Sequence, residues 1–449
     1  MVRFLKSLYL TERFFWALAA LAACSVAGYY VPVLFALARL GVLLLGGAVV
    51  ADGLLLWATR KGKTGGLEGR REVPDKLSNG DENEIVLHLR SRYRFPARVR
   101  VIDEVPVQFQ ARDKGFAVRL APGEEKTLRY TLRPVERGAY AFGALNLYAE
   151  SPLGLLLRRF RTGEAQEAAV YPSLLQMQRY AFLATSNRLE EVGVKKVRRV
   201  GHTLEFDQIR AYVPGDDRRT VNWKATARRA GALMTNQYQE ERSQPVYAVL
   251  DMGRAMRSPF AGMTLLDHAI NAALVLLNIA LLKDDLAGLV TFDEQVRTVL
   301  PATRRRSQLQ RLLEALYRQT TSFRDPTYEG LLATVERSLR QRGLILLFTN
   351  FETRVALARQ LPYLRRIARL HRLVVVFFEN TELRELLQQP AERAEDVYVK
   401  TVAEGLDVEK REIARELERH GIGALLTRPE TLTVDAINRY LQIKAQGAV

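Results

Sequence analysis

Two long apolar runs near the amino terminus constrain this 449-residue chain more than any other feature of its sequence. The first extends from residue 14 to 35 and is apolar apart from one serine and two tyrosines. The second extends from residue 40 to 58 and is interrupted only by Asp52. Each run is long enough to cross a bilayer as a helix. We therefore expect residues 1–64 to form a two-helix transmembrane hairpin that anchors the chain.

Basic residues predict the orientation of this anchor. They flank it on both sides, with Arg3, Lys6 and Arg13 before the first run and Arg60, Lys61 and Lys63 after the second. By the positive-inside rule, both flanks face the cytoplasm. A cleaved signal peptide is the competing interpretation, but the apolar stretch is too long and a second run follows at once. We expect a multi-pass protein of the plasma membrane with the bulk of the chain in the cytoplasm.

The two apolar runs are separated by residues that favour a turn. Val31-Pro32 and Arg39 stand between them and predict the bend of the hairpin. Asp52, in contrast, lies inside the second run, about two helical turns from its cytoplasmic end. An ionisable residue at membrane depth suggests a function by default. So close to the end of the run, we expect the Asp52 carboxylate to reach Arg60 or interfacial water instead.

The chain as a whole is basic, with 67 Lys and Arg residues against 50 Asp and Glu residues and a net charge of +17. Such an excess favours an acidic partner, which includes nucleic acid, anionic lipid and acidic protein surfaces. A basic surface beside an anionic membrane is the simpler interpretation. Runs such as 195–199 and 304–306 keep nucleic-acid or anionic-lipid binding as the alternative. The single cysteine, Cys24, excludes an intrachain disulfide and suits a reducing compartment.

Residues 65–180 show a period of two, which is typical of half-buried strands. Ile85, Leu87 and Leu89 alternate with more polar neighbours, and turn signals such as Ala121-Pro122-Gly123-Glu124 separate similar runs. This pattern predicts an immunoglobulin-like β-sandwich of five or so strands, without a disulfide. We expect it to act as a spacer or a docking module.

Residues 243–449 alternate buried strands with helices. The predicted strands are 246–250, 286–292, 296–300, 344–348 and 373–378, and the predicted helices are 264–282, 307–317, 328–342, 355–370, 402–420 and 431–444. Repeated βα units of this kind favour a mostly parallel, Rossmann-like sheet with helices on both faces. Ligands meet such sheets at the carboxyl ends of the strands. Asp251 and Thr349-Asn350 are therefore expected at one rim.

Residues 181–242 form a third type of sequence, in which dense charge is interleaved with large aromatic residues. Pro214-Gly215 suits the centre of a type II turn, and Asp216 or Asp217 is expected to cap a short helix after it. Arginine side chains offer planar forks for carboxylates. We expect Arg210, Arg219 and Arg228 to pair with Glu205, Asp216 or Glu240-Glu241. Such a network would either join the β-domain to the α/β domain or form an exposed docking surface, and both interpretations stay open.

Motifs for catalysis are scarce. The five histidines, at positions 88, 202, 268, 371 and 420, show no metal-ligand spacing. No Gly-x-Ser-x-Gly elbow, glycine-rich dinucleotide loop or His-Glu-x-x-His helix is present. We therefore expect neither enzymatic activity nor a cofactor, and hold a hydrolase only as a third possibility.

The charged and aromatic segment, GHTLEFDQIRAYVPGDDRRTVNWKATARR, resembles the signature of a bacterial family known as domain of unknown function number fifty-eight. The matching residues are Glu205, Phe206, Arg210, Tyr212, Pro214, Gly215, Asp216, Asp217, Arg219, Trp223, Lys224, Thr226, Ala227 and Arg228. Val221 and Asn222 depart mildly from the usual isoleucine and aspartate. The anchor, the segment RGAYAFGALNLYAESPLGLLLRR and the α/β region are also similar to the family.

This resemblance implies a C-terminal domain like that of von Willebrand factor type A, at the inner membrane of a bacterium. Such domains often bind Mg²⁺ through Asp-x-Ser-x-Ser, a threonine and a second aspartate. Here the first motif reads Asp251-Met252-Gly253-Arg254-Ala255, so both serines are missing. Thr327 still suits the threonine position, but Asn350 stands where the second aspartate is usual. We expect that this degraded rim does not bind Mg²⁺ with useful affinity.

The resemblance also implies a role. Members of the family are similar to proteins that work with MoxR-type AAA+ ATPases and with other von Willebrand type A proteins, in complex assembly or envelope function. We therefore expect a membrane-anchored scaffold or adaptor that mediates protein–protein interaction. The residues expected to form its binding surface or interdomain joint are Glu205, Arg210, Tyr212, Gly215, Asp216, Asp217, Arg219, Trp223, Lys224 and Arg228.

Overall fold

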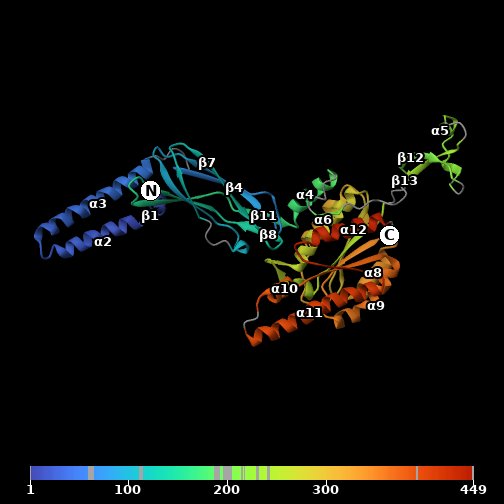
Figure 1. Cartoon of the computed structure of the whole chain (residues 1–449). Coiled ribbons are helices and arrows are strands. Elements are labelled where there is room, and N and C mark those ends of the chain that lie inside the picture. The colour runs from blue at the N-terminus through green and yellow to red at the C-terminus, as the bar shows by residue number, and fades with distance from the viewer. Residues whose placement is uncertain are drawn as a thin grey trace. The chain divides into compact units, whose positions relative to one another are not determined.

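A computed structural model of the full chain describes the protein at residues 2–58, 65–110, 115–186, 193–195, 205–213, 216, 218–228, 232–239, 243–390 and 393–446. It divides into two compact units, Met1–Tyr171 and Pro172–Val449 (Figure 1). The predicted boundary at residue 180 therefore falls too late. Helix α4 (Leu174–Thr185) packs against helix α6 (Leu265–Leu282) of the second unit, and the Ser173 backbone N–H donates to Asn271 Oδ1 at 2.9 Å.

The first unit begins with a short strand and two apolar helices that pack against each other. These elements are α1 (Val2–Leu5), β1 (Leu8–Leu10), α2 (Glu12–Ala27) and α3 (Pro32–Ala58). Pro32 opens α3, because proline suits the first turn of a helix, where its missing N–H is not needed. The predicted helix limits, 14–35 and 40–58, are thus wrong. Arg39, expected in the turn, lies inside α3, 4.4 Å from the centre of the Phe35 ring.

Two helices of the described residues are long and apolar enough to cross a membrane. The first is Pro32–Trp57, within α3, whose side chains are mostly exposed. The second is α6, whose side chains are mostly buried in the second unit. Length and apolarity therefore support membrane association for α3, while α6 is a core helix.

Asp52 does not face interfacial water as predicted, and Arg60, the other predicted partner, lies outside the described residues. Its side chain is fully buried, and its carboxylate accepts hydrogen bonds from the Ser151 hydroxyl and from the backbone N–H groups of Leu153 and Leu155, both at 3.2 Å. The prediction failed because these donors lie about a hundred residues later in the chain. Asp52 ties α3 to the turn before strand β10 (Leu156–Thr162).

The rest of the first unit is β-structure, with more strands than the five or so predicted. The strands are β2 (Leu67–Glu72), β3 (Lys76–Ser78), β4 (Asn83–Ser91), β5 (Ala97–Asp103), β6 (Gly115–Leu120), β7 (Glu125–Leu132), β8 (Gly138–Phe142), β9 (Leu145–Glu150), β10 and β11 (Gln166–Tyr171). They form sheets in the orders β1-β10-β9-β5-β6, β2-β4-β7 and β3-β11-β8. Strict alternation in β5 buries Val99 and Val101 and exposes Arg98 and Arg100. Inward residues of all three sheets share one core.

The second unit is built on a six-stranded sheet in the order β18-β17-β14-β19-β20-β21. Its strands are β14 (Pro245–Asp251), β17 (Leu286–Phe292), β18 (Val296–Thr303), β19 (Leu344–Phe348), β20 (Arg372–Phe378) and β21 (Gly423–Thr427). All neighbours are parallel except β17 and β18, which pair antiparallel. The predicted mostly parallel sheet is therefore present, with β21 as a strand that the sequence did not reveal.

Helices cover this sheet. Besides α4 and α6 they include α7 (Gln308–Tyr317), α8 (Tyr328–Ser338), α9 (Arg354–Leu370), α10 (Thr381–Gln388), α11 (Ala394–Arg419) and α12 (Leu432–Ala445). Helix α6 is buried from Leu265 to Ala280, which explains its nearly uniform apolar sequence. Helix α11 begins eight residues before the predicted 402, in turns whose side chains are mostly exposed. Helix α10 was not predicted, although Leu383, Leu386 and Leu387 form an apolar stripe on one side of it.

The signature segment forms a separate small group of elements. Strands β12 (Glu205–Ala211) and β13 (Met234–Gln239) pair antiparallel, and the 3₁₀ turn η3 (Arg218–Thr220) and helix α5 (Trp223–Arg228) lie between them in sequence. Both η3 and α5 contact β13. The segment therefore folds as a hairpin with its connecting residues packed back on the second strand.

Candidate functional site at the carboxyl edge of the parallel sheet

Asp216 closes the turn of the signature hairpin. One carboxylate oxygen accepts from the Arg210 guanidinium at 2.6 Å, and the other accepts from the Val213 backbone N–H at 3.0 Å. The Tyr212 hydroxyl donates to the Asp216 carbonyl oxygen at 3.2 Å. The Val213 N–H and the Arg210 guanidinium lower the pKa of Asp216. Arg210 therefore makes one of the local ion pairs expected of it.

Helix α5 exposes a large aromatic side chain beside two cations. Trp223 is 71% exposed, and Lys224 and Arg228 are also exposed. The helix is capped by Asn222, whose Oδ1 accepts from the Ala225 backbone N–H at 2.9 Å. We predicted that Asp216 or Asp217 caps this helix. The prediction is wrong for Asp216, because both of its carboxylate oxygens accept hydrogen bonds within the turn.

The remaining signature residues are described only in part. Gly215, Asp217 and the Glu240-Glu241 pair lie outside the described residues, and so do the side chains of Glu205 and Arg219. The contacts described for β12, η3 and α5 are made chiefly with β13. The predicted interdomain joint therefore stays a prediction.

Asp251, at the end of β14, is the buried centre of the carboxyl edge. One oxygen accepts from the Gly253 backbone N–H at 2.7 Å, and the other accepts from the Thr349 hydroxyl at 2.7 Å. The Tyr328 hydroxyl lies 2.8 Å from the Thr349 hydroxyl and 3.4 Å from the same Asp251 oxygen. Burial raises the pKa of Asp251 to about 6, despite these hydrogen bonds.

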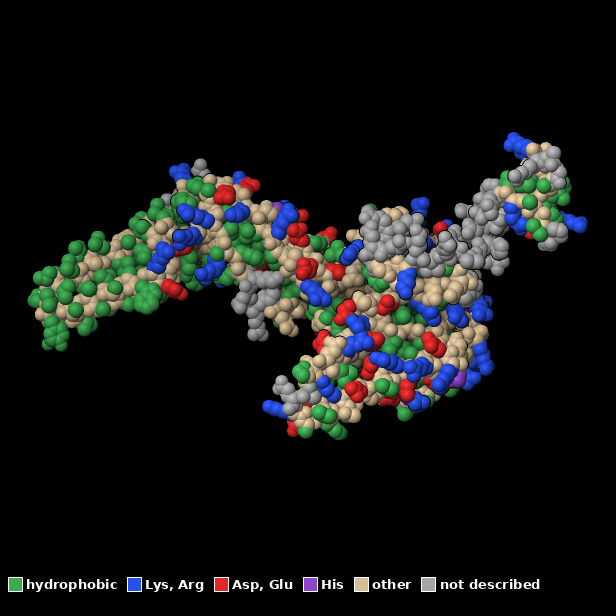
Figure 2. Space-filling view, in the orientation of Figure 1, with side chains coloured by type: hydrophobic (Ala, Val, Ile, Leu, Met, Phe, Trp, Pro, Cys, Tyr) green, Lys and Arg blue, Asp and Glu red, His purple; other side chains and the backbone are tan. Residues whose placement is uncertain are grey.

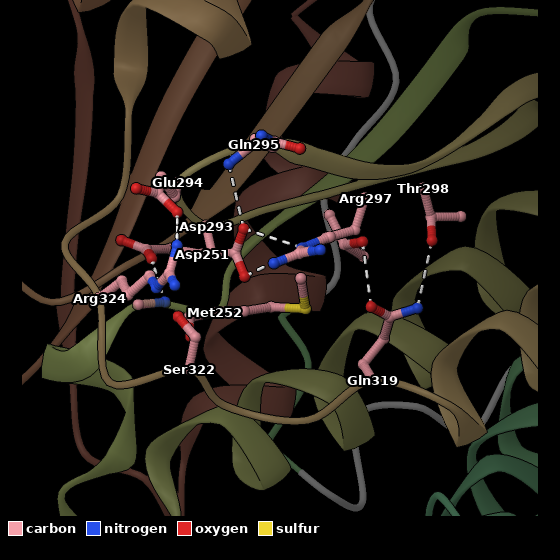
Figure 3. Close-up of polar contacts among 12 residues, drawn as sticks. Asp251, Met252, Asp293, Glu294, Gln295, Arg297, Thr298, Gln319, Ser322 and Arg324 are labelled. Carbon is pink, nitrogen blue, oxygen red and sulfur yellow. Dashed lines mark hydrogen bonds and ion pairs between the residues drawn. The ribbon is translucent and has the colours of Figure 1, made fainter.

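Ion pairs surround this centre, as Figure 3 shows. Asp293, in the turn between β17 and β18, accepts from Arg297 Nε at 3.0 and 3.1 Å and from the Gln295 backbone N–H at 3.1 Å. Burial works to raise the pKa of Asp293, but the Arg297 hydrogen bonds and the Gln295 N–H outweigh it, so the pKa is lowered. Arg324 pairs with Glu294 on the same edge. The edge is thus a set of internally paired charges.

The other two predicted rim residues are held by contacts with residues other than Asp251. Thr327 precedes α8, and its backbone N–H donates to the Asp293 carbonyl oxygen at 2.8 Å. The Asn350 side-chain oxygen accepts from Lys410 Nζ at 2.7 Å. Lys410 also donates to the Phe378 carbonyl oxygen at 2.7 Å. A lysine ammonium therefore holds the asparagine that stands in the usual aspartate position.

Sequence reasoning missed Lys410, although one signal for it existed. Ala403, Ile413 and Leu417 mark the buried face of α11, and Lys410 falls on that face at helical spacing. A lysine on an apolar face needs acceptors for its ammonium. Burial lowers its pKa to about 8, although Glu352 opposes the shift.

A cavity of 500 Å³ opens beside Lys410, at the ends of β19 and β20. Its apolar lining includes Phe260, Leu383 and Leu406. Carboxylates also line it, namely Glu352, Glu379, Glu382 and Asp407. Glu379 is paired with Arg384 and Arg428, and Asp407 with Arg411, so much of this charge is neutralised.

This donor set does not suit Mg²⁺. Both Asp251 oxygens accept protein hydrogen bonds, and the Asn350 oxygen accepts from a cation, whereas Mg²⁺ requires several free hard oxygen ligands. Arg254 adds charge at the edge, with its guanidinium 3.7 Å from Asp325. Among the described residues, no group of three or more His, Cys, Asp and Glu side chains is arranged to hold a metal ion.

Comparison with known sequences identifies one family. Residues 208–413 match the model of the family described as "Protein of unknown function DUF58". The chain is also 28% identical over 184 residues to a Bacillus subtilis (strain 168) protein described as uncharacterized protein YeaD. That alignment covers 39% of this chain and 45% of the relative, so the chain matches less than half the length of the relative.

Comparison with solved structures finds the CARDB domain of the PF1109 protein from Pyrococcus furiosus. A crystal structure of that domain in complex with di-metal ions is 18% identical, and a solution NMR structure is 19% identical. Each covers 23% of this chain, and 86% and 93% of the respective domain structures. The TM-scores are 0.17 and 0.16.

Proposed function

Residues 208–413 of this chain are a DUF58 segment, and from this premise we propose that the protein is a membrane-anchored adaptor that binds other proteins from the cytoplasmic side. The observation that carries the proposal is the exposed Trp223, which lies in the segment that matches the family signature. A large aromatic side chain that is 71% exposed contributes little burial energy to the fold of its own chain. Large aromatic residues are enriched where one protein docks on another.

Other exposed side chains of the signature hairpin add to this surface. On the same hairpin, Val213 is 54% exposed and Leu233 is 45% exposed. Lys224 and Arg228 supply positive charge on the same helix as Trp223. The composition, an aromatic anchor with apolar and basic neighbours, suits a partner that offers an apolar pocket with an acidic margin.

The anchor supports the membrane part of the proposal. Helix α3 is long and apolar enough to span a bilayer, and it carries exposed leucine and valine side chains. Figure 2 shows the apolar surface of α2 and α3 as a continuous rod. The basic flanks predict that both ends of this pair face the cytoplasm. We therefore place the protein in a bacterial inner membrane as a multi-pass protein.

The second unit supports the adaptor part. Its mostly parallel six-stranded sheet, with a single antiparallel edge pair, is compatible with the von Willebrand factor type A-like domain that the family resemblance implies. The donor set at its carboxyl edge favours partner binding without Mg²⁺. We further propose that the β-domain is immunoglobulin-like and that the partner is a MoxR-type AAA+ ATPase, with other von Willebrand type A proteins in the same assembly.

Affinity purification from native membranes tests the proposal. The full-length protein is expected to recover a MoxR-type ATPase, and Trp223→Ala is expected to lose most of it. Phe323→Ala is the matched control, because Phe323 is 73% exposed in the same unit but outside the signature hairpin. Preparations without any such ATPase would contradict the partner, and equal recovery with Trp223→Ala would contradict the docking surface.

A further inference from the structure

The outer face of the sheet β1-β10-β9-β5-β6 carries three arginines without a described acidic partner. Arg98 and Arg100 point outward from β5, and Arg119 points outward from β6, since each lies at an exposed position of an alternating strand. No described carboxylate lies within ion-pair distance of these three guanidinium groups. They line a groove of 720 Å³ together with Tyr9 and Tyr148, among other residues.

Two of these arginines are placed directly opposite each other. In the antiparallel register of β5 and β6, Arg98 pairs with Arg119. Like charges at directly opposed positions destabilise a sheet. The acid opposite Arg98 on its other side is Glu150, and the Glu150 carboxylate lies 3.6 Å from the Arg13 guanidinium. Among the described residues, the arginine pair therefore has an acid at a paired position but no carboxylate within 4 Å.

The register places this pair at the end of the sheet that faces the apolar helices. A single row of paired residues crosses all five strands, from Tyr9 through Leu157, Glu150 and Arg98 to Arg119. Tyr9 precedes Glu12, the first residue of α2, by three residues, or about 10 Å of extended chain. This distance is close to one Debye length at physiological salt, so an anionic surface at the start of α2 is felt at the Tyr9 end of the row. Arg98 and Arg119 lie three and four strand spacings further along the row, about 14 and 19 Å from Tyr9.

The chemistry of the groove suits a phosphate ester at a membrane surface. Guanidinium groups bind phosphate oxygens in a bidentate manner, and tyrosines are enriched at the headgroup level of membranes. Tyr9 and Tyr148 form an edge-to-face pair with ring centres 6.3 Å apart. Figure 2 shows Lys and Arg side chains gathered where the apolar helices meet the β-domain.

We propose that this groove binds the phosphate headgroups of anionic phospholipids, with Arg98, Arg100 and Arg119 as the contacting cations. The inference rests on the membrane anchoring proposed above. Lipid phosphates that neutralise Arg98 and Arg119 remove the repulsion between them. The β-domain is then held against the bilayer by lipid contacts as well as by its helices.

Native mass spectrometry of the delipidated full-length protein in dodecyl maltoside tests this proposal. Phosphatidylglycerol and phosphatidylcholine of equal chain length are added separately. Wild-type protein is expected to retain phosphatidylglycerol in preference. Arg98→Gln/Arg119→Gln is expected to weaken phosphatidylglycerol binding about 25-fold, because each arginine near an anionic surface contributes about fivefold. Arg90→Gln/Arg129→Gln, with the same charge change on the outer face of β4 and β7, is expected to bind like wild type.

The thermal stability of the double arginine variant gives a second, independent measurement. Arg98→Gln/Arg119→Gln is expected to melt at or above the wild-type temperature, since the opposed charges are gone. Equal phosphatidylglycerol binding by this variant and wild type would overturn the proposal. Displacement of the lipid by millimolar inorganic phosphate would also overturn it, in favour of a free-phosphate site. Alkaline carbonate extraction separates the two proposals: release of the protein from native membranes contradicts the anchor, whatever the lipid preference in detergent.

Discussion

At the scale of single residues, the environment of Asp251 differs strongly from that of a typical surface aspartate. It is 2% exposed, and burial raises its pKa to about 6. In the unfolded chain the same carboxyl has a pKa of about 4. The folded protein therefore binds this proton more tightly than the unfolded protein does. Stability from this group is complete below pH 4, falls as the pH rises toward 6, and stays lower above pH 6.

Asp251→Asn is expected to remove this pH dependence. The unfolding free energy of the variant minus that of wild type should increase by about 3 kcal/mol from pH 4 to pH 7. A pKa shift of about two units corresponds to that amount. Urea unfolding of the second unit at both pH values measures the gain. Asp325→Asn is the control, because the Asp325 side chain is 79% exposed on the same edge. A difference in unfolding free energy between variant and wild type that is the same at both pH values would show that folding does not raise the pKa of Asp251.

Residue-scale predictions from the sequence were accurate where the partners were close along the chain or where both followed strands of the parallel sheet. The Arg210–Asp216 pair spans six residues and was among the expected pairs. Asp251 and Thr349 were expected at one rim because both follow strands of a parallel sheet, and the structure joins them at 2.7 Å. Lys410 was not foreseen, since its acceptor Asn350 lies sixty residues earlier and no local pattern links the two.

At the scale of elements, the attachment of α3 to the β-domain depends on Asp52. Asp52→Ala is expected to leave the Ser151 hydroxyl and the N–H groups of Leu153 and Leu155 without their acceptor, at a cost of about 3 kcal/mol. Local opening would then become about 100-fold more frequent. Amide hydrogen exchange at Leu153 and Leu155 in the full-length protein measures how often this local opening occurs.

Ser25→Ala is the control for this measurement. The Ser25 hydroxyl donates only within its own helix, to the Leu21 carbonyl oxygen at 2.9 Å, so its removal should leave exchange at Leu153 and Leu155 unchanged. Exchange that is equally slow in Asp52→Ala would show that packing alone holds α3 to the turn before β10.

Element boundaries were predictable where burial repeats regularly. Strands β14, β17, β19 and β20 are continuous apolar runs, and the sequence placed each to within a residue or so. The antiparallel direction of β18 was not predicted, although the turn at Asp293 between β17 and β18 is too short for a parallel crossover. The start of α3 was missed because apolar runs were read by length, whereas Pro32 determines where the helix begins.

At the scale of the whole molecule, the two units have separate cores. One core gathers side chains from the three sheets of the first unit, and another gathers side chains from the sheet and helices of the second. We expect each unit to unfold on its own. The second unit, expressed as residues 172–449, should melt within about 2 °C of its transition in the full-length protein, which corresponds to less than about 1 kcal/mol of coupling.

Differential scanning calorimetry compares the two proteins directly. A large loss of melting temperature in the 172–449 fragment would mean that the first unit stabilises the second. The sequence predicted four segments, 1–64, 65–180, 181–242 and 243–449, whereas the structure forms two compact units whose boundary depends on α4. Its packing on α6 joins residues that are distant in sequence.

Strand β1 has a topological consequence for the anchor. Residues 8–10 precede the first apolar helix, yet they pair with Leu156–Arg158 in a sheet whose other strands all follow the second helix. The two ends of the helical pair are thereby fixed to one folded body, which cannot lie on both sides of a bilayer. Any crossings made between residue 11 and residue 65 must therefore be even in number, so a reporter fused to the amino terminus and one fused to the β-domain have to mark the same compartment.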